Sequence, residues 1–327
     1  MPYSYIHFQY YYVNSAGFST GFVPKYGKVD EDGISFDEET LAYSDLQAVS
    51  SHKKRLAIQL LPTAEAPEEI GKHIIKDTYA VVVEVEGDSI IEAKKLLVQY
   101  LTTYQCYQRK TELEREGKVE DFRAEQCPNC LALLDLSYYT PTNYIYCKHC
   151  ESIFDKLRQP LPHSENYRVC PDCDYYGRVQ EHREFSCYAV PKDRRLTYTK
   201  HEFCDTCAER LVEQTWWKNA LYLVGIPTTL FMLLTTKETP SPLYAEMTKA
   251  NRYAQDGKLQ QALDLYMLMT LRNEKHPAMW LNYGLAYLAA DDTEKALRYL
   301  KKSLECCSNY QPVLDVLAKY SDKEVPL

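Results

Sequence analysis

The first third of the chain alternates between apolar and polar residues and then changes to a helical period. Residues 3–13 are dense in aromatic and β-branched side chains, and residues 78–86 form the clearest run of this kind. Both runs favour β-strands. Residues 90–104 instead carry apolar side chains at helical spacing. The pattern predicts several short strands closed by one amphipathic helix over 1–106, followed by a charged helical linker over 107–124.

The last quarter of the chain repeats with a period of 34 residues. Small residues recur where two helices would approach closely, and large residues recur where they would fill the gap between turns. Such pairs are Ala250 with Gly284, Tyr253 with Tyr287, and Ala262 with Ala296. The repeat predicts stacked helices over 242–322. About three such repeats are needed for a stable array, and this region holds only two. We therefore expect it to pack on its neighbours or to form a homo-oligomer.

An uncharged run of 18 residues, 219–236, precedes the repeats. This length is close to the lower limit for a membrane-spanning helix. Trp216 and Trp217 stand before it, as aromatic residues do at a membrane interface. We therefore predict a transmembrane or membrane-associated helix over 216–237. A helical hairpin turning at Pro227 and a buried helix in a soluble fold remain open as alternatives.

The overall composition is that of an ordinary globular protein, with 45% hydrophobic and 26% charged residues. The net charge of −8 argues against general nucleic-acid binding. The most basic stretch lies in 156–200, where tyrosines could also stack on bases. Its basic residues are Arg158, Arg168, Arg178, Arg183, Lys192, Arg194 and Arg195, and its tyrosines include Tyr175, Tyr176 and Tyr188. A nucleic-acid-binding protein therefore stays open as an alternative.

Four Cys-x-x-Cys pairs contain eight of the 12 cysteines and supply the clearest candidate chemistry. They are Cys127 and Cys130, Cys147 and Cys150, Cys170 and Cys173, and Cys204 and Cys207. Two pairs complete one tetrahedral zinc site, so the sequence predicts two structural Zn²⁺ ions. We favour sequential pairing over a cross-braced arrangement, because the segment from Cys150 to Cys170 is long for the latter. Thiols spaced for metal indicate a reducing compartment.

Enzymatic interpretations of these cysteines are weaker. A catalytic zinc site keeps an open position and usually has histidine or carboxylate ligands. A dithiol enzyme needs a reactive thiol at a helix N-terminus, and the flanks of the pairs are rich in turns and aromatic residues. The remaining candidate ligands lack partners at ligand spacing, and we assign them to packing or to the surface: His149, His163, His182, Cys187 and His201. We expect a non-enzymatic protein, with a zinc-dependent chaperone or thiol oxidoreductase as an alternative.

The N-terminal segment resembles a bacterial pleckstrin-homology-like domain. The likeness rests on its order of strands and helix and on the stretches 27–36, 41–49 and 55–58. It implies a bent antiparallel barrel closed by a C-terminal helix. The basic turn at Lys53, Lys54 and Arg55 is a candidate site for a lipid headgroup, with a solvated basic turn as the alternative.

The cysteine pairs and the C-terminal repeats resemble two further families. Residues 125–158 and 166–212 are similar to zinc ribbons with rubredoxin-like knuckles, although Leu131 and Asp174 stand where such knuckles usually carry glycine. Residues 242–322 resemble tetratricopeptide repeats, which implies protein binding. The candidate contact residues in the repeats are Tyr253, Trp280, Tyr283 and Tyr287.

Together these features predict a multidomain α+β chain: a pleckstrin-homology-like barrel, two zinc ribbons, one apolar helix and C-terminal helical repeats. We expect a non-enzymatic, zinc-binding adaptor that binds a protein partner through the repeats. The apolar helix predicts membrane association, with the zinc ribbons on the cytosolic side; a cytoplasmic protein is the alternative.

Overall fold

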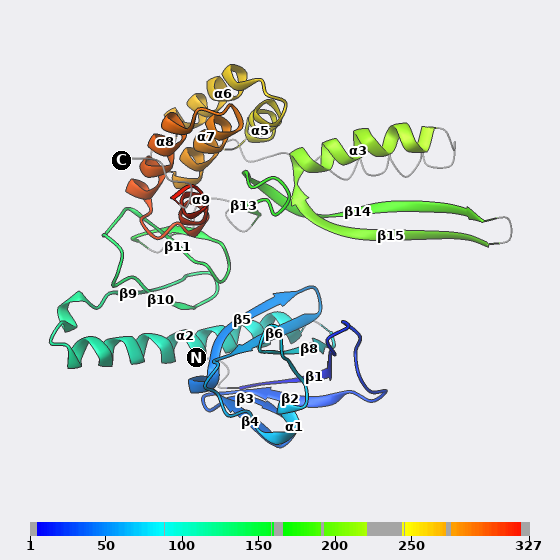
Figure 1. Ribbon diagram of the computed structural model, residues 1–327, viewed down its shortest axis with the longest axis vertical. Helices are drawn as coiled ribbons and strands as arrows, with labels where there is room; N and C mark the ends of the chain where they lie inside the picture. Colours follow the sequence, from blue (N-terminus) through cyan, green and yellow to red (C-terminus); the bar gives the residue numbers. More distant parts are fainter. Residues whose placement is uncertain are drawn as a thin grey trace. The chain divides into compact units, whose positions relative to one another are not determined.

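The computed structural model describes residues 5–87, 89–157, 159, 166–190, 193–220, 244, 246–272 and 276–321. The chain divides into two compact units, Met1–Tyr138 and Tyr139–Leu327. Figure 1 shows the elements of each unit along the chain. The first unit is built on an antiparallel sheet, and the second combines small sheets with C-terminal helices.

Eight strands form the sheet of the first unit, in the order β4-β3-β2-β1-β8-β6-β5 with β7 paired to β8. Their bounds are β1 Ile6–Tyr12, β2 Lys25–Val29, β3 Gly33–Phe36, β4 Glu39–Ala42, β5 Leu46–His52, β6 Arg55–Leu60, β7 Ile74–Ile75 and β8 Ala80–Val85. Two short helical turns lie between strands, η1 Tyr43–Asp45 and α1 Glu68–Gly71. A single long helix, α2 Ser89–Arg115, follows β8.

Alternation along the strands produces the core of this unit. In β1, Phe8, Tyr10 and Tyr12 are buried while the residues between them are not. The first half of α2 adds Leu97 and Leu101 to the same core. Close approach also restricts individual positions, because a Cβ on Gly33 would lie 2.1 Å from the carbonyl oxygen of Leu41. The strands and the start of α2 therefore share one apolar core.

The second half of α2 supports a short hairpin. Helix α2 is followed by η2 Val119–Asp121 and the paired strands β9 Ala124–Gln126 and β10 Leu133–Asp135. The amide of Leu133 donates to Thr102 Oγ1 at 3.0 Å, and Cys106 Sγ lies 3.6 Å from the Leu133 carbonyl oxygen. The segment expected as a linker thus includes the end of a continuous helix that packs on this hairpin.

The second unit contains two small sheets and a group of helices. Its strands are β11 Tyr144–Tyr146, β12 Ile153–Asp155, β13 Tyr167–Val169, β14 Tyr176–Val190 and β15 Asp193–Cys204. Its helices are α3 Asp205–Ala220, α5 Met247–Gln255, α6 Leu259–Arg272, α7 Pro277–Ala289, α8 Thr293–Cys306 and α9 Gln311–Ser321. Strand β14 pairs with β13 and, along most of its length, with β15. The β14–β15 hairpin runs beside α3 (Figure 1).

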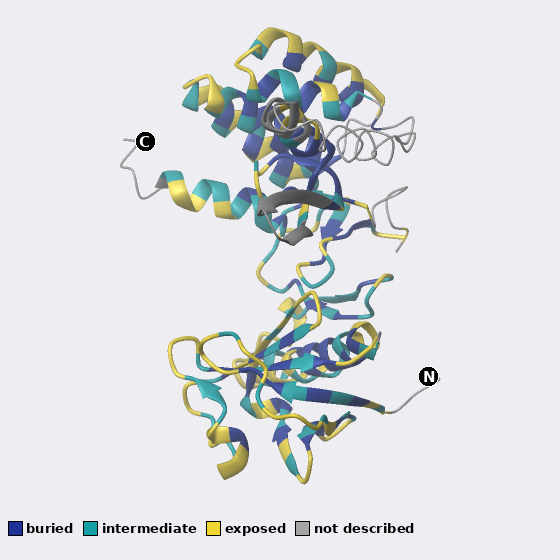
Figure 2. Cartoon of the chain, turned by 90° about the vertical axis from the view of Figure 1, so that its right-hand side faces the viewer, coloured by how far each residue is buried: buried dark blue, intermediate teal, exposed yellow. Residues whose placement is uncertain are grey.

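One apolar core joins these helices to the segments that carry the cysteines. Tyr146, Tyr167 and Tyr176 from the strands are buried in the same cluster as Tyr266 and Tyr310 from the helical region. Figure 2 shows buried positions between the C-terminal helices and exposed positions on their outer sides. The C-terminal helices are therefore stabilised by the cysteine segments as well as by their contacts with one another.

The predicted fold class is wrong in its membrane helix. Among the residues that the structure describes, no helix is long and apolar enough to cross a membrane. Residues 216–220 of the expected span form the end of α3, and residues 221–237 lie outside the described residues. Helix α3 begins at Asp205 and carries Glu209 and Glu213, which both pair with Arg252 of α5. The described fold is mixed α+β, with an N-terminal antiparallel sheet and C-terminal helices.

Candidate metal centres

The eight paired cysteines gather into two groups of four. Within each group the four sulfur atoms all lie within 4.8 Å of one another. The first group is Cys127, Cys130, Cys147 and Cys150, and the second is Cys170, Cys173, Cys204 and Cys207. Both follow the sequential order of the chain and neither is cross-braced. Each group could hold one metal ion.

Three of the four pairs sit in turns of the same backbone geometry. In each turn the amide of the first cysteine donates to the carbonyl five residues later, and its carbonyl accepts from the amide four residues later. The residue after the second cysteine is left-handed in all three, with φ of 63° at Leu131, 60° at Glu151 and 62° at Asp174. None of these is glycine, so the turns form without the residue that usually relieves this conformation.

The fourth pair is different and departs from the two-knuckle ribbon that we expected. Cys204 is the last residue of β15, and Cys207 lies in the first turn of α3. The amide of Cys204 donates to Cys170 Sγ at 3.2 Å. The N-terminus of a helix carries a partial positive charge that stabilises nearby thiolates. The second group therefore combines one knuckle with a strand-to-helix junction, a context that the turn-rich flanks did not reveal.

Sulfur distances in the second group fit a tetrahedral metal site. Cys170 Sγ lies 3.9 Å from Cys207 Sγ, and Cys204 Sγ lies 3.7 Å from the sulfurs of both Cys173 and Cys207. A tetrahedral ion with bonds of about 2.3 Å to sulfur, as for zinc, separates its sulfurs by about 3.8 Å. A disulfide would bring two sulfurs to about 2.05 Å. The residues present thus fit a four-thiolate ion.

Packing the four thiols together makes their ionisation interdependent. Hydrogen bonds from Cys173 and then from Cys204 and Cys207 lower the pKa of Cys170. Hydrogen bonding to Cys170, Cys173 and Cys204 raises the pKa of Cys207. Without a cation the pKa is thus lowered at Cys170 and Cys204 and raised at Cys173 and Cys207, so the four thiols do not ionise together. A bound cation would allow all four to ionise together.

A small core and a buried ion pair surround the second group. Val179, Phe203 and Ala208 pack against its cysteines. Arg178 Nε lies 2.8 Å from Asp205 Oδ2, and both side chains are largely buried. This pair ties β14 to the first residue of α3, where an acidic side chain also favours the helix N-terminus. The ion pair therefore fixes the start of the helix that carries Cys207.

Two asparagines of the helical region hold the backbone of the cysteine segments. Asn282 of α7 accepts from the amide of Tyr176 at 2.7 Å and donates to its carbonyl at 2.8 Å. Asn309 makes the same two bonds with Tyr146, at 3.0 and 2.8 Å. Tyr146 precedes Cys147 directly, and Tyr176 lies three residues after Cys173. No local pattern in the sequence predicts these bonds, because the partners are far apart in the chain.

The four residues predicted to bind a protein partner are only partly accessible. Trp280 and Tyr283 are buried, and Tyr253 and Tyr287 are half-buried. Tyr299 of α8 stacks on Trp280, Tyr283 and Tyr287, with ring centroids 5.9, 4.7 and 5.4 Å apart. These aromatic side chains therefore hold α7 against α8.

The basic stretch also looks different once folded. Tyr175 and Tyr176 are buried, Arg178 is paired with Asp205, and Arg168 Nη2 lies 3.0 Å from Glu202. His182 is buried and stacks on Phe203 of β15. The remaining candidates have side chains outside the described residues: Arg158, His163, Arg183, Cys187, Tyr188, Lys192, Arg194 and Arg195.

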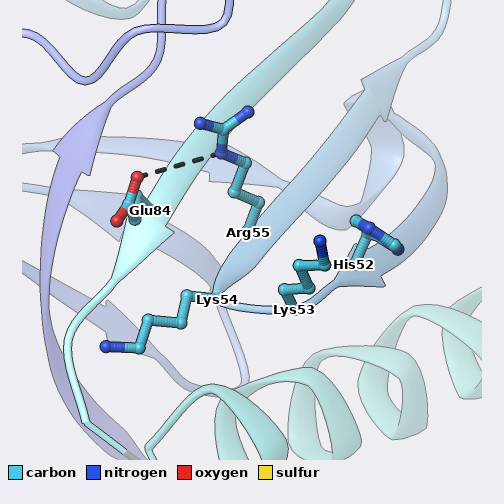
Figure 3. A pocket seen from close by; sticks show the side chains of 5 residues that line it. All are labelled: His52, Lys53, Lys54, Arg55 and Glu84. Carbon is cyan, nitrogen blue, oxygen red and sulfur yellow. Dashed lines mark ion pairs between the residues drawn. The ribbon is translucent and has the colours of Figure 1, made fainter. Parts of the chain in front are cut away.

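The candidate lipid residues line a cavity of 440 Å³ at the turn between β5 and β6. Figure 3 shows this cavity with His52, Lys53, Lys54, Arg55 and Glu84. The side chains of the histidine and both lysines are exposed. Arg55 Nε lies 3.8 Å from Glu84 Oε2. The turn thus presents two lysines beside an arginine that is partly neutralised.

Part of the chain is similar to a human protein. No protein-family model matches the chain, and no solved structure matches it. One segment of 86 residues is 34% identical to the human Protein RRP5 homolog. That match covers 26% of this chain and 4% of the human protein, so the chain spans only a small fraction of the length of that relative.

Proposed function

We propose that this protein is a non-enzymatic adaptor whose scaffold is held together by two structural zinc ions. The observation that carries the proposal is the closed, all-cysteine character of both groups. Four thiolates fill the coordination sphere of zinc and leave no position for a substrate or an activated water. The first cysteine of each of the three knuckles is completely buried, which suits a structural ion.

A scaffold role is also supported by the way in which the helices depend on the metal segments. The buried tyrosines and the two asparagine clamps make the cysteine turns part of the helical core. Zinc would therefore stabilise the helical region as well as the turns. Such a unit serves to present a surface in a fixed shape.

The partner-binding surface that we favour lies on α6. Met267, Leu268 and Leu271 are exposed there. Their spacing of three and four residues places them on one face of the helix. Contiguous exposed apolar side chains mark protein interaction sites, and the apolar face of a partner helix would complement this ridge. Trp280 and Tyr283 would then shape the repeats from inside, while Tyr253 and Tyr287 remain available at the edge.

The two alternative functions have less support. Tyr175, Tyr176 and Arg178 are buried. They are therefore not available to contact a nucleic acid. Dithiol chemistry requires thiols that a substrate disulfide can reach, whereas at least one cysteine of each Cys-x-x-Cys pair is buried, and both are buried in the pair Cys204 and Cys207. We therefore retain the adaptor as the proposal.

A binding experiment with matched variants tests the adaptor proposal. Leu271→Asp places a charge on the exposed ridge of α6, and Gln261→Asp places the same charge on another exposed position of that helix. Partners captured by the zinc-loaded wild type from its native host should be lost with Leu271→Asp and kept with Gln261→Asp. Capture that is equal for both variants would exclude the α6 ridge, and measurable turnover of a substrate would exclude a purely non-enzymatic role.

A further inference from the structure

The loop between β1 and β2 displays large apolar side chains to solvent. Phe18 is 70% exposed, Phe22 103% and Val23 76%. All three lie within a segment of six residues that also contains Gly21, whose φ is 90°. Exposed apolar residues are ordinary when scattered, but a cluster of this kind in one loop indicates a binding surface.

Hydrogen bonds hold this loop in a defined shape. The amide of Phe18 donates to Asn14 Oδ1 at 2.9 Å, and the amide of Asn14 donates to the Phe18 carbonyl at 2.9 Å. The amide of Thr20 donates to the Tyr12 carbonyl at 2.7 Å. These bonds fix the first part of the loop, up to Thr20, and so present Phe18 in a defined conformation.

The same loop is attached to the basic turn between β5 and β6. Arg55 Nη2 donates to the carbonyl of Gly17 at 2.8 Å. Ser19 Oγ donates to Glu84 Oε2 at 2.6 Å, and Glu84 in turn pairs with Arg55. Glu84 lines the cavity with the lysines (Figure 3). These bonds link the apolar loop to the cationic turn. The two segments together, the β1–β2 loop with residues 52–55, are defined here as the docking surface.

We propose that this surface docks on the face of an anionic lipid bilayer. Phe18, Phe22 and Val23 would enter the boundary between headgroups and acyl chains, while Lys53 and Lys54 would remain among the anionic headgroups. The exposed lysines complement an anionic surface, because Glu84 is already engaged by Arg55 and Ser19. Combining apolar insertion with cationic attraction suits a peripheral, reversible contact. The proposal concerns the first unit and is independent of the α6 ridge.

Vesicle co-sedimentation of the zinc-loaded full-length protein tests this proposal. The probes are vesicles of phosphatidylcholine alone and of phosphatidylcholine with phosphatidylserine at about 7:3, the latter representing an anionic leaflet. The wild type should bind the anionic vesicles and bind the neutral ones much more weakly, and added salt should weaken the binding.

Paired variants separate the two parts of the surface. Lys53→Glu with Lys54→Glu should lower the partition coefficient about 25-fold or more. Each lysine near the membrane surface contributes about fivefold to this value. Phe22→Ser should lower it about tenfold. The charge control is Lys110→Glu on α2 with Lys118→Glu just after that helix. The apolar control is Tyr107→Ser, an exposed position on α2.

Each outcome decides for or against the proposal. Loss in both test variants with retention in both controls supports it, provided that circular dichroism and zinc content match the wild type. Absence of wild-type binding to anionic vesicles overturns it, and so does binding that the controls reduce as much as the test variants. Retention of vesicle binding by both test variants would assign the contact to another part of the chain and would equally overturn it.

Discussion

Asn282 offers the sharpest test of the coupling between the helices and the second cysteine group. Its side chain is completely buried and bonds to both the amide and the carbonyl of Tyr176. Substitution by alanine removes both bonds. Asn251 Nδ2 still donates to the Tyr176 carbonyl at 3.0 Å, so the group left without this partner is the buried amide.

The expected size of the effect follows from that amide. A buried donor without its partner costs about 1–3 kcal/mol, and the lost bonds add about 0.5–1.5 kcal/mol. A total of about 3 kcal/mol corresponds to a decrease of about 6–12 °C in Tm for a unit of this size. The amide belongs to the strand that leads out of the Cys170 knuckle, so part of the energy should appear as weaker zinc binding. Partners outside the coordination sphere typically change metal affinity by about 10–100-fold.

Chelator competition measures this directly. With Asn282→Ala, one of two zinc equivalents should be released at a chelator concentration where the wild type retains both. Asn309→Ala should weaken the other equivalent, because Asn309 holds Tyr146 beside Cys147. Asn143→Ala, at an exposed position, should change neither. Two zinc affinities that stay at the wild-type value in Asn282→Ala would refute the coupling.

Three further predictions concern stability. Arg178→Met removes the ion-pair partner of the buried Asp205 and should lower the free energy of unfolding in urea by about 3–5 kcal/mol. The double variant Arg178→Met with Asp205→Leu should recover most of this loss. A double variant as unstable as the single one would argue against the ion pair as the cause. Cys170→Ser should reduce bound zinc from two ions to one and destabilise α7 and α8, which would exchange their amide hydrogens faster. Unchanged exchange would show that the stability of these helices does not depend on the metal. Burial lowers the pKa of His276 to about 3, so the unfolded chain takes up its proton below about pH 6.5 while the folded protein stays neutral. Stability should therefore fall by about 1.4 kcal/mol between about pH 7.5 and 5.5, and this loss should be absent in His276→Asn, which can still cap α7; equal pH dependence in both proteins would assign the loss to other groups.

The sequence was most informative where the chemistry is local. Four pairs of one spacing predicted which cysteines would meet, since each turn needs only its own residues. The left-handed residues Leu131 and Asp174 show that the knuckle does not require glycine when its hydrogen bonds and thiols are in place. The strand-rich start and the helix after it were likewise visible, because alternation and helical period are local patterns.

Features that depend on distant partners could not be predicted. In sequence Cys204 and Cys207 look like a fourth knuckle. In the structure they lie where β15 ends and α3 begins, and α3 packs there against Val179 and Phe203. Asn282 and Asn309 act on backbone more than 100 residues away. The predicted membrane helix is not found among the described residues, where residues 216–220 are the end of a helix that begins at Asp205 and pairs Glu209 and Glu213 with Arg252 of α5.

The central claim is that two closed four-thiolate zinc sites hold the scaffold together, and metal analysis of the purified protein tests it most directly. Elemental analysis under reducing conditions should find two zinc ions per chain. Replacement by Co²⁺ should give the absorption of tetrahedral sites bound by four thiolates, and removal of both ions should lower the helical circular dichroism by the share of the C-terminal helices. One ion or none per chain, or a spectrum that requires oxygen or nitrogen ligands, would contradict the account.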